Sequence, residues 1–430
     1  MLKNYVKIAF KVFLRRKFYT FISLFGISLT LVVLMVAAAL FDHFAGPYPP
    51  ETRTDRTLYV VEILATNQEG SQINSGSPSY AFLDRYVRGL PGAEGVSVFS
   101  KGGVSVSYDD VEKIESHVML TDGSFWDVFA FDFLEGRPYT EQEAREGSFV
   151  AVINEATRRK FFGEESAVGK RIEVDGQNFR VSGVVANVPI FRQKTFADIW
   201  VPVSTSPSEA YRTYAPSEGY GSYTFRGNFQ AAILAWHSGD IPLLKEAFQT
   251  RLAQVEFPDP RRYDRIQAAA YTPLEEISRQ AYGEGFSTAA FTEVYVDDLL
   301  FTLIGSGLLF MLLPALHLIN LNVSRIMERA SEIGVRKTFG ASSRSLVGQF
   351  VVENVLLTLM GGVVGFLLSF WVLFALSHSQ LIQYGQFHLN YRIFLFGLLV
   401  TLFFGVFSGV YPAWKMSRLH PAEALRGGSL

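Results

Sequence analysis

Histidine, serine and carboxylate side chains are the residues of this chain that could carry out acid–base or nucleophilic chemistry. The seven histidines are widely scattered, at positions 43, 117, 237, 317, 378, 388 and 420. The sequence contains no HExxH pair, no GxSxG motif and no pair of carboxylates that stands out. It also contains no cysteine, which excludes a disulfide, a thiolate metal site and a cysteine nucleophile. These residues therefore indicate no enzyme active site.

The run from Gly163 to Lys170 has a superficial similarity to a phosphate-binding loop. Its spacing is one residue too long, and Arg171 stands where a serine or threonine would hold magnesium. We therefore expect a surface turn at this place, and no nucleotide-binding module within this chain.

The most informative pattern lies in the segment from Arg325 to Ser342, RIMERASEIGVRKTFGAS. It predicts a short helix with charges of both signs and an apolar face, ended by Gly340 in the left-handed conformation. Its apolar residues, among them Ile333 and Val335, form either a docking surface for another protein or a face that packs under the chain's own membrane helices.

The sequence also contains four long apolar runs. Each is longer than the approximately 18 residues that distinguish a membrane-spanning helix from a buried core helix. The first run could instead be a cleaved signal peptide, but its apolar stretch is longer than the roughly 7–15 residues of a signal sequence. We therefore predict an α-helical membrane protein with four transmembrane helices, at 18–43, 299–323, 346–377 and 393–414.

The distribution of basic residues predicts the orientation of these helices. Lysine and arginine are concentrated in 1–17, in 324–345 and in the C-terminal tail, 415–430. The positive-inside rule places these three segments in the cytoplasm. The large domain, 44–298, and the short loop, 378–392, are then expected on the outer side, which gives a self-consistent topology.

The N-terminal segment, 1–17, has apolar residues at helical spacing with lysines between them. This pattern predicts an amphipathic helix on the inner membrane surface. A simple basic flank that orients the first membrane helix is the other interpretation, and the two are compatible.

Small and charged residues within the apolar runs carry further predictions. Glu353 is an ionisable residue at membrane depth and thus a functional candidate. Because it lies near the cytoplasmic end of its run, we favour a solvated or snorkelling position. Glycines four residues apart either let helices approach closely or are incidental. These pairs are Gly361 with Gly365 and Gly405 with Gly409.

The overall composition agrees with a membrane protein. Hydrophobic residues make up 49% of the chain and charged residues 19%, below the quarter that is usual in soluble domains. The net charge of −2 gives no reason to expect a nucleic-acid partner.

The large domain has the alternating strand-like and helix-like segments of an α+β fold. Asn154 is expected to cap a helix that runs to Phe162, and Asp175-Gly176-Gln177-Asn178 is a hairpin turn signal. An amphipathic helix is predicted at 241–255. Strands are predicted at 58–63, 96–100, 104–108, 149–153, 171–174 and 179–185.

These motifs together resemble a known family. The run Glu332 to Ala341, EIGVRKTFGA, is similar to the coupling segment of the FtsX-like and MacB-like ABC transporter permeases. The opening LKNY and FYTFI resembles the start of such permeases, particularly those of Bacteroidetes-type bacteria. Further motifs follow the family's periplasmic core domain and C-terminal signature in order: LEGRP (134–138), VINE (152–155), FFG (161–163), VGK (168–170), VSGVV (181–185), YPAWK (411–415) and PAEALR (421–426).

The resemblance implies a permease subunit in a bacterial inner membrane, without an ATPase of its own. Two such chains, identical or related, would pair, and each would dock on an ABC ATP-binding subunit. ATP and magnesium would be bound by that subunit, and no cofactor by this chain. The inserted part of the periplasmic domain would fall near 120–190. The implied docking residues are Arg329, Glu332, Ile333, Gly334, Val335, Arg336, Lys337, Gly340 and Ala341.

The same resemblance implies mechanotransmission, in which ATP-driven movement of the coupling segment is passed through the helices to the external domain. The apolar runs contain few ionisable groups, which disfavours a polar solute path. Two outputs stay open. One is export of a periplasmic substrate such as a peptide, antibiotic or lipoprotein, with a periplasmic adaptor or outer-membrane partner. The alternative is a regulator that senses a ligand or activates a cell-wall hydrolase.

Overall fold

The computed structural model contains two compact units. The helical domain comprises 1–42, 300–379 and 386–430, and the large domain comprises 43–299 and 380–385. The structure describes residues 2–67, 73–109, 112–207, 225–257, 260–283, 293–327, 335, 338–340, 342–379, 382–387 and 390–417.

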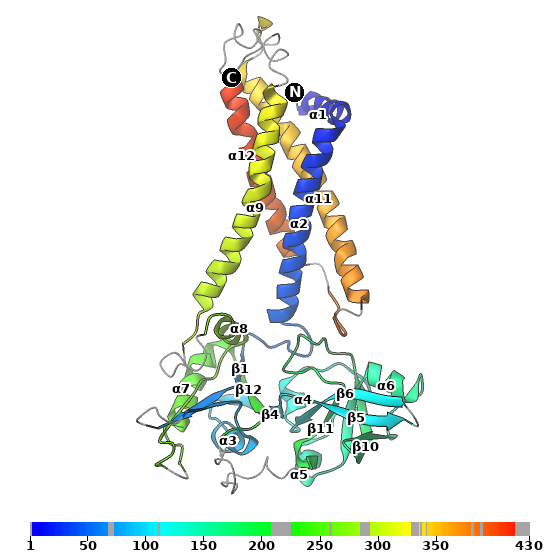
Figure 1. The fold of residues 1–430 in the computed structure, drawn as a ribbon, viewed down its shortest axis with the longest axis vertical. Helices are drawn as coiled ribbons and strands as arrows, with labels where there is room; N and C mark the ends of the chain where they lie inside the picture. Colours follow the sequence, from blue (N-terminus) through cyan, green and yellow to red (C-terminus); the bar gives the residue numbers. More distant parts are fainter. Residues whose placement is uncertain are drawn as a thin grey trace. The chain divides into compact units, whose positions relative to one another are not determined.

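Within the described residues, the helical domain contains one short and four long helices (Figure 1). Every predicted transmembrane segment corresponds to one long helix, with ends that agree within four residues. The helices are α1 (Leu2–Arg15), α2 (Lys17–Ala45), α9 (Val296–Met327), α11 (Ser343–His378) and α12 (Tyr391–Ser417).

Two of these helices are long and apolar enough to cross a membrane within the residues that the structure describes. They are α2 and the part of α11 from Ser345 to His378, while α12 contains a shorter apolar stretch, Phe394–Phe403. The predicted crossing by four helices is thus supported in part.

Helix α1 is amphipathic and packs on α11. Its buried side chains Ala9 and Phe13 form one cluster with Ile27 and Leu31 of α2 and with Leu357 of α11. The opposite face of α1 stays exposed, as expected for a helix with one apolar stripe.

The large domain contains two β-sheets. The strands of the first are β1 (Thr57–Val60), β4 (Ala93–Ser100), β5 (Gly103–Asp109), β6 (Glu112–Thr121), β7 (Phe133–Gly136), β8 (Val150–Asn154), β9 (Arg171–Val174), β10 (Gln177–Val185), β11 (Ile199–Pro202) and β12 (Phe229–Ala235). This ten-stranded sheet has the order β1–β12–β4–β6–β11–β8–β10–β7, with β5 paired to β6 and β9 paired to β10. The second has the order β13–β2–β3, from β2 (Ile63–Thr66), β3 (Ile73–Gly76) and β13 (Arg265–Ala268).

Helices pack on these sheets and complete an α+β domain (Figure 1). The α-helices are α3 (Tyr80–Tyr86), α4 (Phe125–Val128), α5 (Glu141–Glu146), α6 (Glu155–Phe162), α7 (Ile241–Leu252) and α8 (Pro273–Tyr282). Two short 3₁₀ turns lie at Val203–Thr205 and Ser238–Asp240.

Local signals in the sequence produce the expected local structures. The Asn154 side chain caps α6 by accepting a hydrogen bond from the Thr157 N–H at 2.7 Å. Asp175 and Gly176 connect β9 to β10 with φ values of 49° and 75°. Positive φ at both turn residues is the requirement of a type I′ hairpin, so both predictions are confirmed.

The predicted strand at 58–63 is wrong as a single element. The chain forms β1 and β2 instead, separated by Val61 and Glu62, and the two strands belong to different sheets. β1 pairs with β12, whereas β2 pairs with β3 and β13. Pattern alone did not separate them because both strands are apolar and buried.

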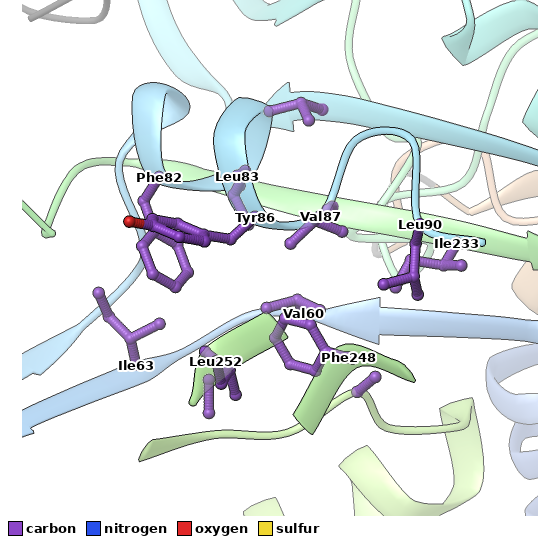
Figure 2. Close-up of a cluster of buried hydrophobic side chains, with 14 of the residues drawn as sticks. Val60, Ile63, Phe82, Leu83, Tyr86, Val87, Leu90, Ile233, Phe248 and Leu252 are labelled. Carbon is purple, nitrogen blue, oxygen red and sulfur yellow. The ribbon is translucent and has the colours of Figure 1, made fainter. Parts of the chain in front are cut away.

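A hydrophobic core joins the two sheets. Figure 2 shows side chains of α3 and α7, including Phe82 and Phe248, converging near Val60 and Ile233 of the strands. Strand β12 is buried along its whole length, which places it at the centre of this core. Residues 120–190, the expected inserted part, contribute β7 to β10 and extend the same ten-stranded sheet.

Candidate functional site: the docking motif and the helix junctions

The motif expected to dock a partner lies mostly outside the described residues. Val335 and Gly340 are described, and the role of the whole motif stays a prediction from the sequence. The other predicted docking residues lie outside the described part of the chain: Arg329, Glu332, Ile333, Gly334, Arg336, Lys337 and Ala341.

The described end of the motif presents apolar side chains to solvent. Val335 is 46% exposed and Phe339 is 88% exposed. The Phe339 N–H donates to the Val335 carbonyl at 3.2 Å, and Gly340 follows with a φ of 87°. This left-handed conformation is the one expected of a glycine that ends a helix. Apolar side chains as exposed as Phe339 suit a surface that another protein covers.

Two of the predicted packing glycines lie directly against α2. A Cβ atom added at Gly361 would lie 2.6 Å from the Ile27 Cγ2 atom, and one added at Gly365 would lie 3.0 Å from the nearest atom of α2. The Ser28 hydroxyl donates to the Gly361 carbonyl at 3.0 Å. Because these two glycines have no side chain, α11 and α2 can approach each other closely. The surroundings of two further glycines are outside the described residues: Gly405 and Gly409.

Glu353 is buried, which corrects the expectation of a solvated position. The residue is only 1% exposed, and it accepts a hydrogen bond from the Gln349 amide at 3.0 Å. Asn354 and Thr358 are buried nearby on the same helix. Helix α1 packs on the same helix, α11, and the Tyr5 and Ser345 hydroxyls lie 2.9 Å apart, a tertiary contact that the sequence position of Glu353 does not reveal.

The chain leaves α2 through a segment that Arg192 fastens to the large domain. Arg192 is 2% exposed and donates to the Gly46 carbonyl at 2.8 Å and to the Phe44 carbonyl at 3.5 Å. Its guanidinium also lies 3.5 Å from the Glu51 carboxylate, which accepts from the Thr195 hydroxyl at 2.8 Å. Burial raises the pKa of Glu51, and the charge of Arg192 opposes that rise. One buried cation thus neutralises a buried acid and satisfies carbonyls at the end of α2.

The chain enters α9 beside α8. The Tyr295 N–H donates to the Ser278 hydroxyl at 3.1 Å, and Ser278 is fully buried on α8. Glu276, on the same helix, accepts from the Lys194 ammonium at 2.6 Å. Helix α8 therefore connects the start of α9 to the chain segment that contains Arg192.

The connection between α11 and α12 contacts that segment as well. The Ile190 N–H donates to the Gln383 carbonyl at 3.1 Å. The Tyr384 hydroxyl donates to the Asp198 carboxylate at 3.0 Å, and its ring centre lies 6.4 Å from that of Phe196. Burial raises the pKa of Tyr384, so the hydroxyl remains protonated and able to donate.

We call residues 189–198 the junction segment, because it contacts the chain at all three of these connections. It lies between β10 and β11 of the ten-stranded sheet. Asp198 anchors its end, since the carboxylate accepts from the His117 N–H at 2.8 Å and from the Asn154 amide at 3.0 Å. Displacement of any one connection would therefore act on the same part of the sheet.

Sequence reasoning missed the junction segment. Arg192 and Lys194 lie in a short basic and apolar run, which local patterns do not distinguish from an ordinary surface loop. The contacts of the junction segment join residues that are far apart in the chain. Tyr384 and Asp198, for example, are 186 residues apart. The one available signal was the pair of cations within an otherwise apolar stretch.

Two further features predicted or considered from the sequence are a metal site and a phosphate-binding loop. Among the residues that the structure describes, no three His, Asp or Glu side chains group as a metal site requires. The run that resembles a phosphate-binding loop is a turn in which Lys170 pairs with Glu165 and lies over the Phe162 ring.

Two protein families match successive parts of the chain. Residues 20–237 match the MacB-like periplasmic core domain. Residues 302–421 match the FtsX-like permease C-terminal domain. The two matches lie in the order in which the large domain and the last three long helices occur.

Individual relatives show the same relationship. The ABC transporter permease YknZ of Bacillus subtilis is 24% identical over 99% of both chains. The macrolide export ATP-binding/permease protein MacB of Bdellovibrio bacteriovorus is 26% identical over 78% of this chain, which spans 48% of that relative. A solved domain of a permease protein from Porphyromonas gingivalis covers 51% of this chain, with 18% identity and a TM-score of 0.39.

Proposed function

This protein belongs to the ABC transporter permeases that have a MacB-like periplasmic core domain and an FtsX-like C-terminal domain, and from this premise we propose how it works. It acts as the permease subunit that couples ATP hydrolysis by a separate ABC ATPase to movement of the large domain. The ATPase partner carries the ATP and magnesium, and this chain carries no cofactor of its own. The segment around Glu332 to Ala341 docks on that partner.

The proposed topology has α2, α9, α11 and α12 crossing the inner membrane of a bacterium. Both termini and 324–345 face the cytoplasm, and the large domain is outside. Two permease chains, identical or related, pair in the membrane. Support comes from the basic residues on one side of the apolar runs and from the length of the four helices.

The observation that carries the proposal is the convergence of three connections on the junction segment. Arg192 contacts the end of α2, Lys194 contacts the helix that precedes α9, and Asp198 contacts the loop between α11 and α12. Polar contacts to buried groups are stiff, because breaking them leaves buried polar atoms unsatisfied. Movement of the long helices would therefore be delivered to β10 and β11.

The output that we favour is export of a periplasmic substrate such as a peptide, an antibiotic or a lipoprotein. Support comes from relatives whose name describes macrolide export. A periplasmic adaptor or an outer-membrane partner would then complete the export path.

The docking proposal is tested by replacing Gly334 with tryptophan and Arg336 with glutamate. Each variant is co-expressed with the partner ABC ATPase subunit, and copurification and ATPase activity are measured. We expect association at least about tenfold weaker, since a bulky side chain or reversed charge opposes the contact. Arg145→Glu, an exposed change on α5, is the control. Normal copurification and normal stimulated ATPase activity in both variants would refute this docking site.

A further inference from the structure

A large cavity opens on the large domain beside the junction segment. Its volume is about 1120 Å³, slightly above the roughly 300–1,000 Å³ of typical small-molecule sites. Its lining comes from the end of β3, the turn between β4 and β5, the start of β12, α8 and the junction segment. The cavity therefore has room for several residues of a peptide.

The charged residues of the lining leave an excess of positive charge. Four are lysine or arginine and two are glutamate. Both acids have cationic neighbours within the cavity. The Lys194 ammonium lies 2.6 Å from Glu276, and the Arg279 guanidinium lies 3.7 Å from Glu62. The formal charges of the six lining residues therefore sum to +2, and one of the two further cations, Arg226, donates to the Asn74 side chain at 3.3 Å.

Lys101 is an exposed cation of the cavity lining. Within the described part of the chain, its ammonium has no hydrogen-bond or ion-pair partner, and it stands in the turn between β4 and β5. The protein around it displaces solvent, which lowers the pKa of Lys101, and the positive charge of Lys194 lowers it further. A carboxylate placed beside it would oppose both effects, because a neighbouring negative charge favours the charged ammonium.

Backbone groups border the cavity next to this ammonium. Gly102 and Gly103 follow it in the turn and add no side chains. Gly76 ends β3 with a φ of 147°, and a Cβ atom there would lie 2.8 Å from the Arg226 Nε atom. Three consecutive residues, Ser75–Ser77, line the cavity. Ser75 and Gly76 belong to β3, whereas the Ser77 carbonyl accepts from the Gly227 N–H at 2.9 Å, so the strand borders the cavity at Ser75 and Gly76.

Strand edges of this kind bind extended peptides. Among the described strands, β3 pairs only with β2, so its other edge has no described strand partner. An added peptide gains main-chain hydrogen bonds from such an edge, and pockets for its side chains give selectivity. Apolar side chains in the lining, such as Val61 and Phe196, would accept uncharged side chains of the peptide.

We propose that this cavity binds an acidic peptide in an extended conformation, with one carboxylate beside the Lys101 ammonium. The biological role of that peptide, as exported substrate, rests on the proposed function. Binding itself requires neither ATP nor the ATPase subunit. Since Ile190, Lys194 and Phe196 belong to both the lining and the junction segment, the bound peptide contacts the segment that receives movement from the helices.

The test uses the full chain purified in detergent, without ATPase. The probe is a hexapeptide of alternating alanine and glutamate with a neutral fluorescent label, and its reference is the same peptide with glutamine. Fluorescence anisotropy measures both affinities. We expect the glutamate peptide to bind about tenfold more tightly than the glutamine peptide, because only a carboxylate can form a charge-assisted hydrogen bond with the Lys101 ammonium. Lys101→Gln should remove most of this preference, and Lys101→Glu should abolish it.

Lys160→Glu provides the matched control, because Lys160 is an exposed lysine on α6 outside the cavity lining. This variant should bind like the unmodified protein, and thermal unfolding checks that all variants are folded. Equal binding of the two peptides, or an unchanged preference in both Lys101 variants, would overturn the proposal. Displacement by inorganic phosphate at the peptide's own concentration would also overturn it, by identifying a simple anion site. The docking variants of Gly334 and Arg336 test the proposed function separately.

Discussion

At the scale of single residues, Arg192 shows how one buried side chain can hold the chain that follows a long helix. It satisfies two backbone carbonyls at the end of α2 and neutralises Glu51 in a buried place. A buried arginine with these partners is costly to remove, because its partners stay behind without compensation. Loss of Arg192 should therefore leave Glu51 and two backbone carbonyls buried without this partner.

Replacing Arg192 with methionine should destabilise the large domain by about 3–5 kcal/mol at neutral pH. Loss of the cation raises the pKa of Glu51 further above its value in the unfolded chain. The contribution of Glu51 to stability is then fully present below the pKa that Glu51 has in the unfolded chain. It is lost as pH rises through the pKa that Glu51 has in the folded protein. Urea unfolding, followed by tryptophan fluorescence, measures the free energy of unfolding. The decrease caused by Arg192→Met should therefore be smaller at about pH 5 than at about pH 7.5.

The exposed pair of Arg145 with Glu141 supplies the comparison for this experiment. The Arg145 side chain is 71% exposed, and surface pairs contribute roughly 0–1 kcal/mol. Arg145→Met should therefore change stability little at either pH. If Arg192→Met lost the same stability at both pH values, the assigned role of Glu51 would be incorrect.

At the scale of elements, the contact between α2 and α11 depends on the absence of side chains. Gly361 faces Ile27 so closely that an added methyl group cannot fit without movement. Gly305 of α9 has no neighbouring atom within 4 Å among the described residues. The two glycines thus form a natural pair for comparison within long helices.

Gly361→Ala should lower the stability of the helical domain by about 1–3 kcal/mol, the usual cost of overpacking. Gly305→Ala should instead be neutral or stabilise by roughly 0.5–1 kcal/mol, because alanine favours a helix. Adding Ile27→Ala to Gly361→Ala creates space and should recover part of the loss. Thermal unfolding in detergent measures all three. Equal behaviour of the two glycine variants would contradict close packing at Gly361.

At the scale of the whole molecule, the proposed topology can be tested cleanly because the chain contains no cysteine. Single cysteines are introduced at Lys11, Ser342, Lys160 and Gln386, and intact spheroplasts are treated with a membrane-impermeant maleimide. We expect labelling at Lys160→Cys and Gln386→Cys. Lys11→Cys and Ser342→Cys should react only after permeabilisation, since basic flanks stay in the cytoplasm.

Labelling of Ser342→Cys in intact spheroplasts would refute the orientation. Labelling after permeabilisation, with mass spectrometry of the modified protein, controls for accessibility at every position. The outcome also bears on the docking motif, because a cytoplasmic ATPase can reach Glu332 to Ala341 only if Ser342 is on the same side of the membrane.

Local features of the fold followed from the sequence. The long helices, the Asn154 cap and the Asp175–Gly176 hairpin were all predicted, since each depends on residues that are close in the chain. The docking motif also belongs to this level, and it rests on sequence because most of it is outside the described residues.

By itself the sequence determined the long apolar helices, the α+β character of the large domain and the family. These properties follow from hydropathy, charge and short-range hydrogen bonding, which act along the chain. Only the tertiary structure decided that Glu353 is buried, that Gly46 and Tyr384 both contact the junction segment, and that Lys101 lines a cavity with several cations. Burial and ion pairing depend on residues far apart in sequence, and only folding brings those residues together.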